Sequence, residues 1–270
     1  NVSTAIAVSP ESGIGTVNTI RNTKFETTFT GEVGLRGNYS TIFNYAMEVS
    51  PVDESNLNQS LIIVTPNTID YGGITEMWTD GSAIAFCPLS EDSYPYDARG
   101  IIQHEAGGHG FGKLGDEYIY HNTFIDFCDC TCCEHVFEFN IAKSLGWYEN
   151  LSLTGKMHEV PWSHLIFDDR YSDVVDIYEG GFKHARGVFR SEQNSCMNNN
   201  ISYYNAISRE AIVKRIMEYA GESYSFEKFV ENDKRDAVNS LSRSAERPGV
   251  TVRGNQYAPR IHKGKPDILK

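Results

Sequence analysis

The sequence predicts a mixed α/β fold of the α+β class, with short strands and helices sharing the core. Two short apolar runs, Leu61–Val64 and Ser82–Cys87, are each closed by a following proline and have the length of buried strands. Apolar residues at helical spacing predict a long amphipathic helix over Asn205–Ala220. The predicted strands are too few and too irregularly spaced for a doubly wound parallel sheet.

Further elements follow from local signals along the chain. Residues 1–10 have the alternating pattern of a strand, and a chain that begins inside a strand suggests a processed form of a longer protein. Asp97 is placed to cap a helix that begins near Ala98, because its side-chain oxygens accept from first-turn amides. A second helix is predicted over His135–Leu145, ending at Gly146 as a left-handed stop.

Composition excludes two classes of partner. The formal net charge of −12 leaves no basic footprint for a nucleic acid, so we expect no polynucleotide ligand. No run approaches the roughly 18 apolar residues of a membrane helix, so no membrane span is expected. The charge is uneven, since residues 232–270 hold nine Lys or Arg and four Asp or Glu.

Four of the six cysteines crowd into Cys128-Asp-Cys130-Thr-Cys132-Cys133. In an oxidising compartment this cluster would form local disulfides, and in a reducing one it could bind a metal. The spacing offers no second ligand pair at a distance, so disulfides or free thiols are favoured over a zinc ribbon.

The most informative segment is 103–118, with His104-Glu105 on a helix and His109 about one turn later. Two imidazoles on one helix face are zinc ligands, and a glutamate beside the first acts as general base toward the water that the zinc activates. A third protein ligand beyond the helix would leave the fourth position open. The pattern predicts a zinc-dependent hydrolase with one catalytic Zn²⁺.

The spacing departs from H-E-x-x-H, because three residues separate Glu105 from His109. On a regular α-helix, residues five apart diverge by roughly 140°. A π-bulge inserts one residue and would bring both histidines to one face. Gly107-Gly108 lowers the cost of such a distortion, so we predict a one-residue bulge near Gly107.

These residues resemble the immunoglobulin-A peptidase type of zinc metallopeptidase, found largely in gut bacteria. The resemblance rests on His104-Glu105, His109, Gly112, Leu114, Asp116-Glu117-Tyr118 and the segment Phe189–Met197. It implies a zincin-like fold, in which a twisted sheet presents an edge strand beside the active-site helix. We place that edge at Ser82–Cys87, and the methionine turn below the metal at Met197. The inserted glycine departs from the commoner family spacing.

The resemblance also guides the third ligand and the domain boundaries. Related zincins place the ligand six residues after the second histidine, where this chain has Gly115. Asp116 matches the family's Asp-Glu-Tyr and is the favoured ligand, with Glu117 as the rival. We expect residues 1–231 to form the catalytic domain. Residues 232–270 would be a basic C-terminal extension, packed on it or flexible.

The leading prediction is an endopeptidase with a protein or peptide substrate, in which Glu105 is the base and His104, His109 and Asp116 hold the zinc. An extracytoplasmic location follows from the resemblance only. Two alternatives stay open: an inactive zinc-containing surface binding module, and a zinc amidase acting on cell-wall or glycan substrates. The remaining histidines tested for ligand spacing have no partner and are interpreted as ordinary: His121, His135, His158, His164 and His184.

Overall fold

The computed structural model describes residues 15–16, 24–30, 34–68, 72–90, 92–126, 132–235 and 257–268. The chain divides into two compact units, one formed by residues 1–111 with 253–270 and the other by residues 112–252. Each unit combines helices with a mixed sheet, in agreement with the predicted α+β class. The strand predicted over residues 1–10 lies outside the described residues.

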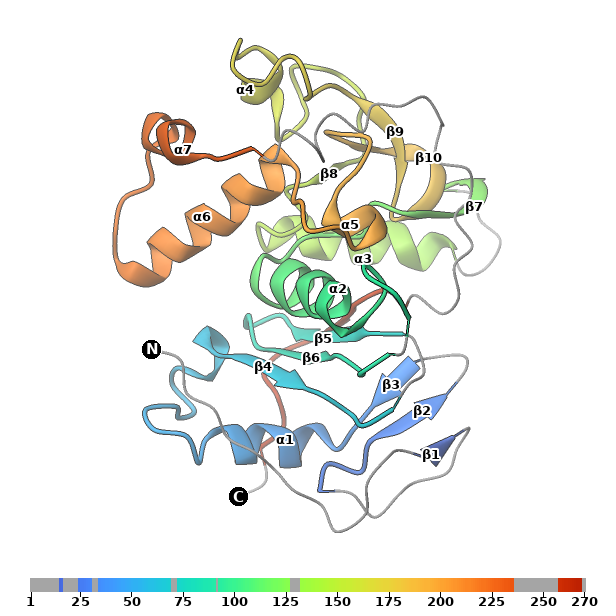
Figure 1. The fold of residues 1–270 in the computed structure, drawn as a ribbon, viewed down its shortest axis with the longest axis vertical. Helices are drawn as coiled ribbons and strands as arrows, with labels where there is room; N and C mark the ends of the chain where they lie inside the picture. The colour runs from blue at the N-terminus through green and yellow to red at the C-terminus, as the bar shows by residue number, and fades with distance from the viewer. Residues whose placement is uncertain are drawn as a thin grey trace. The chain divides into compact units, whose positions relative to one another are not determined.

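The first unit is built on two sheets (Figure 1). Its elements are β1 (Gly15–Thr16), β2 (Thr28–Thr30), β3 (Gly34–Arg36), α1 (Tyr39–Ala46), η1 (Leu57–Gln59), β4 (Leu61–Val64), β5 (Ile74–Trp78), β6 (Ala83–Phe86), α2 (Ala98–Ile102), the π-helix η2 (Gln103–Phe111) and β11 (Arg260–His262). Strands β1, β2 and β3 form the smaller sheet, and the larger has the order β11-β5-β6-β4. Strand β11 comes from the segment predicted as an extension.

The larger sheet corrects the predicted edge strand. Strand β6 pairs antiparallel with β5 and parallel with β4, so Ser82–Cys87 supplies an internal strand. Among the described residues, β6 is the one strand paired with β4, which makes β4 an edge. The physical reason lies in the side chains: every residue of β6 is buried, whereas Leu61 and Ile63 of β4 are 39% and 44% exposed. The prediction that Leu61–Val64 is a buried strand is wrong for the same reason.

Alternation along β6 divides the core into two layers. Ile84 and Phe86 pack with Phe43 of α1 in one cluster, and Ala85 and Cys87 pack with residues of α2 and η2 in another. Figure 1 shows α1 and the α2–η2 segment on opposite faces of this sheet. The small residues on the η2 side let that helix approach the strands closely, which positions the residues of segment 103–111.

The second unit surrounds a four-stranded sheet in which β10 pairs with β7, β8 and β9. Its elements are β7 (Ile119–Phe124), α3 (Cys132–Ser144), β8 (Leu151–Ser152), α4 (Ser163–Ile166), β9 (Tyr178–Gly181), β10 (Lys183–Arg190), α5 (Cys196–Asn199), α6 (Ala206–Ala220) and α7 (Phe226–Asn232). Strand β10 runs parallel to β7 and antiparallel to β8 and β9.

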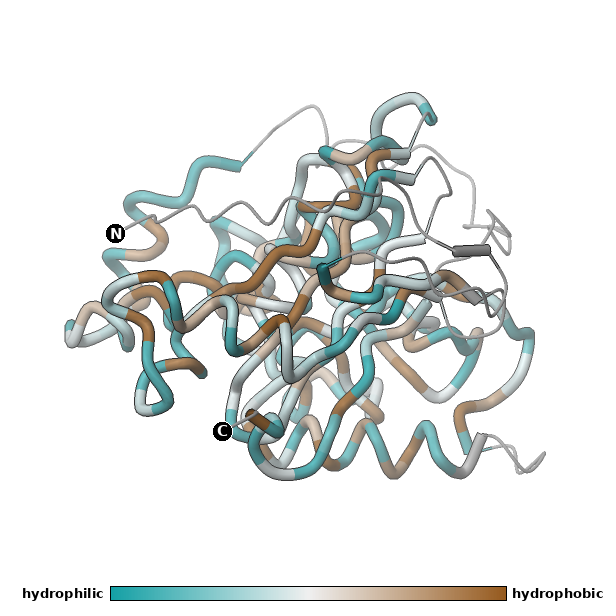
Figure 2. The backbone as a smooth tube through the Cα atoms, turned by 90° about the horizontal axis from the view of Figure 1, so that it is seen from below, coloured by the Kyte–Doolittle hydropathy of each residue, from teal (hydrophilic) through white to brown (hydrophobic). Residues whose placement is uncertain are grey.

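Two of the predicted helices are confirmed here. Helix α6 is capped by Asn205, whose side chain accepts from the Ser208 amide, and it ends at Gly221 in the left-handed region. Helix α3 begins three residues earlier than predicted and is followed by Gly146, also left-handed. Hydrophobic and hydrophilic residues interleave along α3, as Figure 2 shows.

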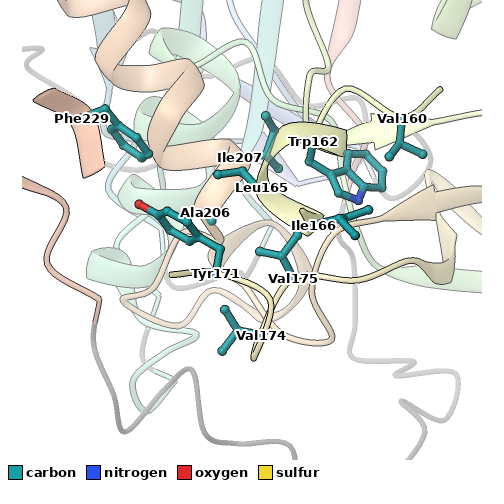
Figure 3. Packing of buried hydrophobic residues seen from close by; sticks show 10 residues of the cluster. All are labelled: Val160, Trp162, Leu165, Ile166, Tyr171, Val174, Val175, Ala206, Ile207 and Phe229. Carbon is teal, nitrogen blue, oxygen red and sulfur yellow. The ribbon is translucent and has the colours of Figure 1, made fainter. Parts of the chain in front are cut away.

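An apolar cluster joins the α4 region to α6 and α7 (Figure 3). Trp162 is fully buried, and its indole N–H donates to the Asp176 carbonyl at 2.9 Å, which satisfies its one polar atom. Leu165 and Ile207 pack into the same cluster from α4 and α6. In the described part of the chain, the helices are all too short or too polar to cross a membrane.

Candidate metal centre

The metal-binding motif lies on a helix that changes its winding. Asp97 accepts hydrogen bonds from the Arg99 and Gly100 amides, which starts α2 as predicted. After one regular turn, the chain continues as the nine-residue π-helix η2. In a π-helix the backbone bonds join residues five apart, so positions 104 and 109 lie one above the other.

The two histidines therefore meet on one side of η2. The Nε2 atoms of His104 and His109 are 3.1 Å apart, and their ring centroids are 4.8 Å apart at an interplanar angle of 75°. Both side chains are buried, at 4% and 0% exposure. The predicted local distortion is confirmed, although it extends over the whole of Gln103–Phe111 and not over one inserted residue.

Glu105 is held against strand β5. Its side chain is buried, and the Thr75 hydroxyl lies 2.8 Å from its Oε2 atom. Gly73 also lies close to this side chain, since a Cβ added there would lie 2.5 Å from Glu105 Cγ. The carboxylate charge adds to burial in raising the pKa of the Cys87 thiol, so this cysteine stays protonated. Thr75 of β5 and Gly73 just before that strand thus position the glutamate.

Asp116 follows η2 in the sequence and is buried. The Tyr118 hydroxyl donates to Asp116 Oδ2 at 3.0 Å, and the Asp116 backbone carbonyl accepts from the Phe182 amide. Within the continuous segment 104–116, ligand atoms of His104, His109 and Asp116 all lie within 4.8 Å of one another. Two imidazoles and one carboxylate are donors that suit zinc.

Glu117, the rival ligand, is surrounded by donors of its own unit. Its Oε1 accepts from the amides of Asn150 and Asn205 at 2.9 and 2.6 Å, and its Oε2 accepts from the Ser195 hydroxyl. Burial raises its pKa, and the three side-chain donors oppose that rise. Both oxygens are therefore engaged in joining the 117 segment to α6 and to the residues before α5.

Met197 lies at the start of the short helix α5 and is fully buried. The Met197 carbonyl accepts a hydrogen bond from the Glu117 amide at 2.8 Å. The residue predicted for a methionine turn is therefore hydrogen-bonded to the residue that follows Asp116, the predicted third ligand.

Two tyrosine hydroxyls donate to carboxylates of the second unit, Tyr203 to Glu192 at 2.7 Å and Tyr118 to Asp116. Each of these hydroxyls has a structural partner.

Comparison with protein-family models and with curated proteins found no match for this chain. The structure does report on the histidines that the sequence left unassigned. His164 pairs with Glu210 at 2.8 Å, and His158 stacks on Phe167, which are ordinary structural roles. The other three, His121, His135 and His184, are brought together in the second unit. Spacing could not reveal this, because the three come from different elements separated by up to 63 positions.

Proposed function

We propose that this protein is a zinc-dependent endopeptidase with a zincin-like catalytic region, of the immunoglobulin-A peptidase type that its motif resembles. The observation that carries the proposal is the pair of imidazole nitrogens 3.1 Å apart on η2, with a buried glutamate between the two histidines in sequence. We assign His104, His109 and Asp116 as the zinc ligands. The engagement of both Glu117 oxygens by other donors supports Asp116 over Glu117.

A zinc ion bound by this set would polarise the scissile carbonyl and make water acidic enough to attack it at neutral pH. The protein's own contribution is proton transfer by Glu105. Its carboxylate accepts a proton from the attacking water and delivers it to the leaving nitrogen, so one group serves as base and then as acid. The Thr75 contact at Oε2 keeps this carboxylate in one orientation during both transfers.

Strand β4 supports an extended peptide as the substrate. It is an edge strand with Leu61 and Ile63 exposed, and η2 lies beside it. Gly110 permits that approach, since a Cβ there would lie 2.8 Å from Leu61 Cδ1. An edge strand pairs with extended chains through its backbone, and exposed apolar side chains add contacts. We propose that the substrate is a protein or peptide, and that the enzyme works outside the cytoplasm, as in the resembling family.

Two other functions use the same zinc site. A surface binding module that had lost activity would need no buried glutamate fixed by a strand hydroxyl, so the Thr75–Glu105 contact favours the enzyme. A zinc amidase acting on cell-wall or glycan substrates would use identical chemistry. Only substrate profiling separates it from a peptidase, and the exposed β4 edge favours the peptidase.

The test compares Glu105→Gln with Glu54→Gln, an exposed glutamate in a turn of the same unit. Zinc content is measured by mass spectrometry, and peptide hydrolysis is measured on a mixed peptide library. We expect Glu105→Gln to keep its zinc and lose activity by about 100-fold or more, while Glu54→Gln behaves as wild type. Full activity in Glu105→Gln would rule out the base, and hydrolysis of glycan amides alone would favour the amidase.

A further inference from the structure

Three histidines gather in the second unit on three different elements. His121 on β7 and His184 on β10 are register partners in a parallel pair of strands, and His135 lies in the first turns of α3. The ring centroids of His135 and His184 are 5.2 Å apart, and those of His121 and His184 are 5.9 Å apart. None of the three belongs to the proposed catalytic machinery.

The His135–His184 pair has the geometry of two ligands of one ion. The Nδ1 atom of His135 faces Nε2 of His184 at 2.9 Å, with an angle of 69° between the rings. Two nitrogens bound to one tetrahedral zinc at about 2.0–2.1 Å would lie about 3.3 Å apart. The pair at His104 and His109 has nearly the same arrangement, at 3.1 Å and 75°.

Thr123 determines which nitrogen of His184 faces its partner. The Thr123 hydroxyl contacts Nδ1 at 3.1 Å, so when this nitrogen carries its proton toward the hydroxyl, the lone pair of Nε2 points at His135. A hydrogen bond from the second ring nitrogen to a protein oxygen is the usual support of a metal-binding histidine. His184 is fully buried, which leaves little freedom for its ring.

Two charged residues adjoin the pair in sequence, Lys183 before His184 and Glu134 before His135. The positive charge of Lys183 weakens the attraction of a cation to this position, and the carboxylate of Glu134 offsets part of that effect.

We propose that His135 and His184 form a second metal site, for a zinc-like transition-metal ion, with His121 as the third ligand. Among the described residues, the ligand atoms of these three histidines do not converge as those of His104, His109 and Asp116 do. The exposed His121 must therefore turn its side chain toward the pair to complete the set. An all-imidazole set suits Zn²⁺, Cu²⁺ or Ni²⁺ better than Mg²⁺ or Ca²⁺. The ion would connect α3 to the β7–β10 strand pair, which makes its role structural. This inference is independent of the proposed peptidase activity.

The experiment measures zinc per chain in the full-length protein after dialysis against trace zinc, by mass spectrometry. We expect two ions in wild type and one in the double variant His135→Ala/His184→Ala. The variant His104→Ala/His109→Ala should also hold one ion, and His158→Ala, an exposed control, should hold two. Retained zinc at the remaining site reports that each double variant is folded. A single ion in wild type, lost in His104→Ala/His109→Ala, would overturn the proposal.

A rival source of a second ion is the cysteine-rich sequence 128–133, which precedes His135. Replacing zinc with Co²⁺ distinguishes a cysteine site from a histidine site, because thiolate ligands give an intense charge-transfer absorption and imidazoles do not. We expect no such band in wild type, and unchanged zinc in a variant with all four of these cysteines replaced by serine. A thiolate band would show that cysteines bind a metal ion, and a second ion that survives His135→Ala/His184→Ala would show that this pair does not hold it. Either result would overturn the histidine site.

Discussion

The Thr75 hydroxyl lies 2.9 Å from the main-chain carbonyl oxygen of Glu105 and 2.8 Å from its carboxylate Oε2. One side chain therefore contacts both the backbone and the functional group of the proposed base. Thr75 belongs to β5, which is internal to the sheet and fully buried. Through this contact the buried strand β5 holds the side chain of Glu105, which lies on the π-helix η2, in one orientation.

The first prediction concerns Thr75→Val, which keeps the side-chain shape and removes the hydroxyl. We expect kcat to fall about tenfold or more, with little change in zinc content, because the carboxylate loses its fixed orientation.

Thr75→Ser serves as the matched variant, because it restores the hydroxyl and should recover most of the activity. A merely structural role would lower the stability of Thr75→Val and leave the kcat of the folded protein in place. Equal kcat in wild type and Thr75→Val would show that the hydroxyl does not position Glu105.

Local signals predicted the unusual winding of the helix that carries His104 and His109, whereas they could not predict which distant strands would pair. The extra residue between Glu105 and His109, together with Gly107-Gly108, required an unusual turn, and the structure has one. By contrast, strand order depends on contacts distant in sequence, so nothing local distinguished β6 from an edge strand. Likewise, no feature of Arg260–His262 indicated that it would pair with β5.

The side-chain partners of the histidines and acids could not be predicted either, because they too lie far apart in the sequence. His121, His135 and His184 lack any ligand spacing, and only the pairing of β7 with β10 and the position of α3 bring them together. The choice between Asp116 and Glu117 stayed open in the sequence for a similar reason. The partners that engage Glu117 lie 33 to 88 positions away, on other elements.

The second prediction separates the roles of these two acids. Glu117→Gln places an amide group where a carboxylate oxygen now accepts hydrogen bonds, so we expect a loss of about 2–3 kcal/mol in unfolding free energy. Asp116→Asn should instead lower zinc affinity, with a smaller change in the free energy of unfolding of the metal-free protein. Chemical denaturation of the metal-free proteins measures the change in unfolding free energy, and zinc titration measures the change in zinc affinity, for both variants. The assignment would be reversed if Glu117→Gln lost zinc and Asp116→Asn kept it.

The third prediction concerns pH and Glu192, which is buried and accepts from the Tyr203 hydroxyl and the Ala206 amide. Burial raises its pKa to about 7 from an unfolded value of 4.5. Between these values the unfolded chain has released the proton and the folded protein keeps it. The contribution of Glu192 to the free energy of unfolding is therefore largest below pH 4.5. It falls as the pH rises to 7, by about 3 kcal/mol in total.

Glu192→Gln mimics the protonated form and should remove this pH dependence. Denaturant unfolding at pH values from 4.5 to 8, for both proteins, gives the difference between their unfolding free energies. We expect the variant to gain stability relative to wild type across this range and to level off above pH 7. A constant difference from pH 4.5 to 8 would contradict the raised pKa.

The last prediction tests how β11 is held. Glu76 of β5 is fully buried, and its carboxylate accepts from Arg260 at 2.9 Å, from the Tyr39 hydroxyl at 2.9 Å and contacts His262 at 2.7 Å. Burial and the Glu76 charge raise the pKa of Tyr39, which keeps this hydroxyl a donor. The Glu76 carboxylate on β5 thus contacts Tyr39 of α1 as well as Arg260 and His262 of β11.

Glu76→Gln removes the charge and leaves Arg260 without its counter-ion, so we expect a loss of about 2 kcal/mol or more. The loss should be local to β11. The Thr79 amide, which donates to the His262 carbonyl, should exchange hydrogen faster, whereas the Cys87 amide, which donates to Val64, should keep its protection. Glu48→Gln, an exposed change on the same unit, is the control. Unchanged exchange at Thr79 would show that backbone pairing alone holds β11, because the strand would then stay docked without its buried ion pair.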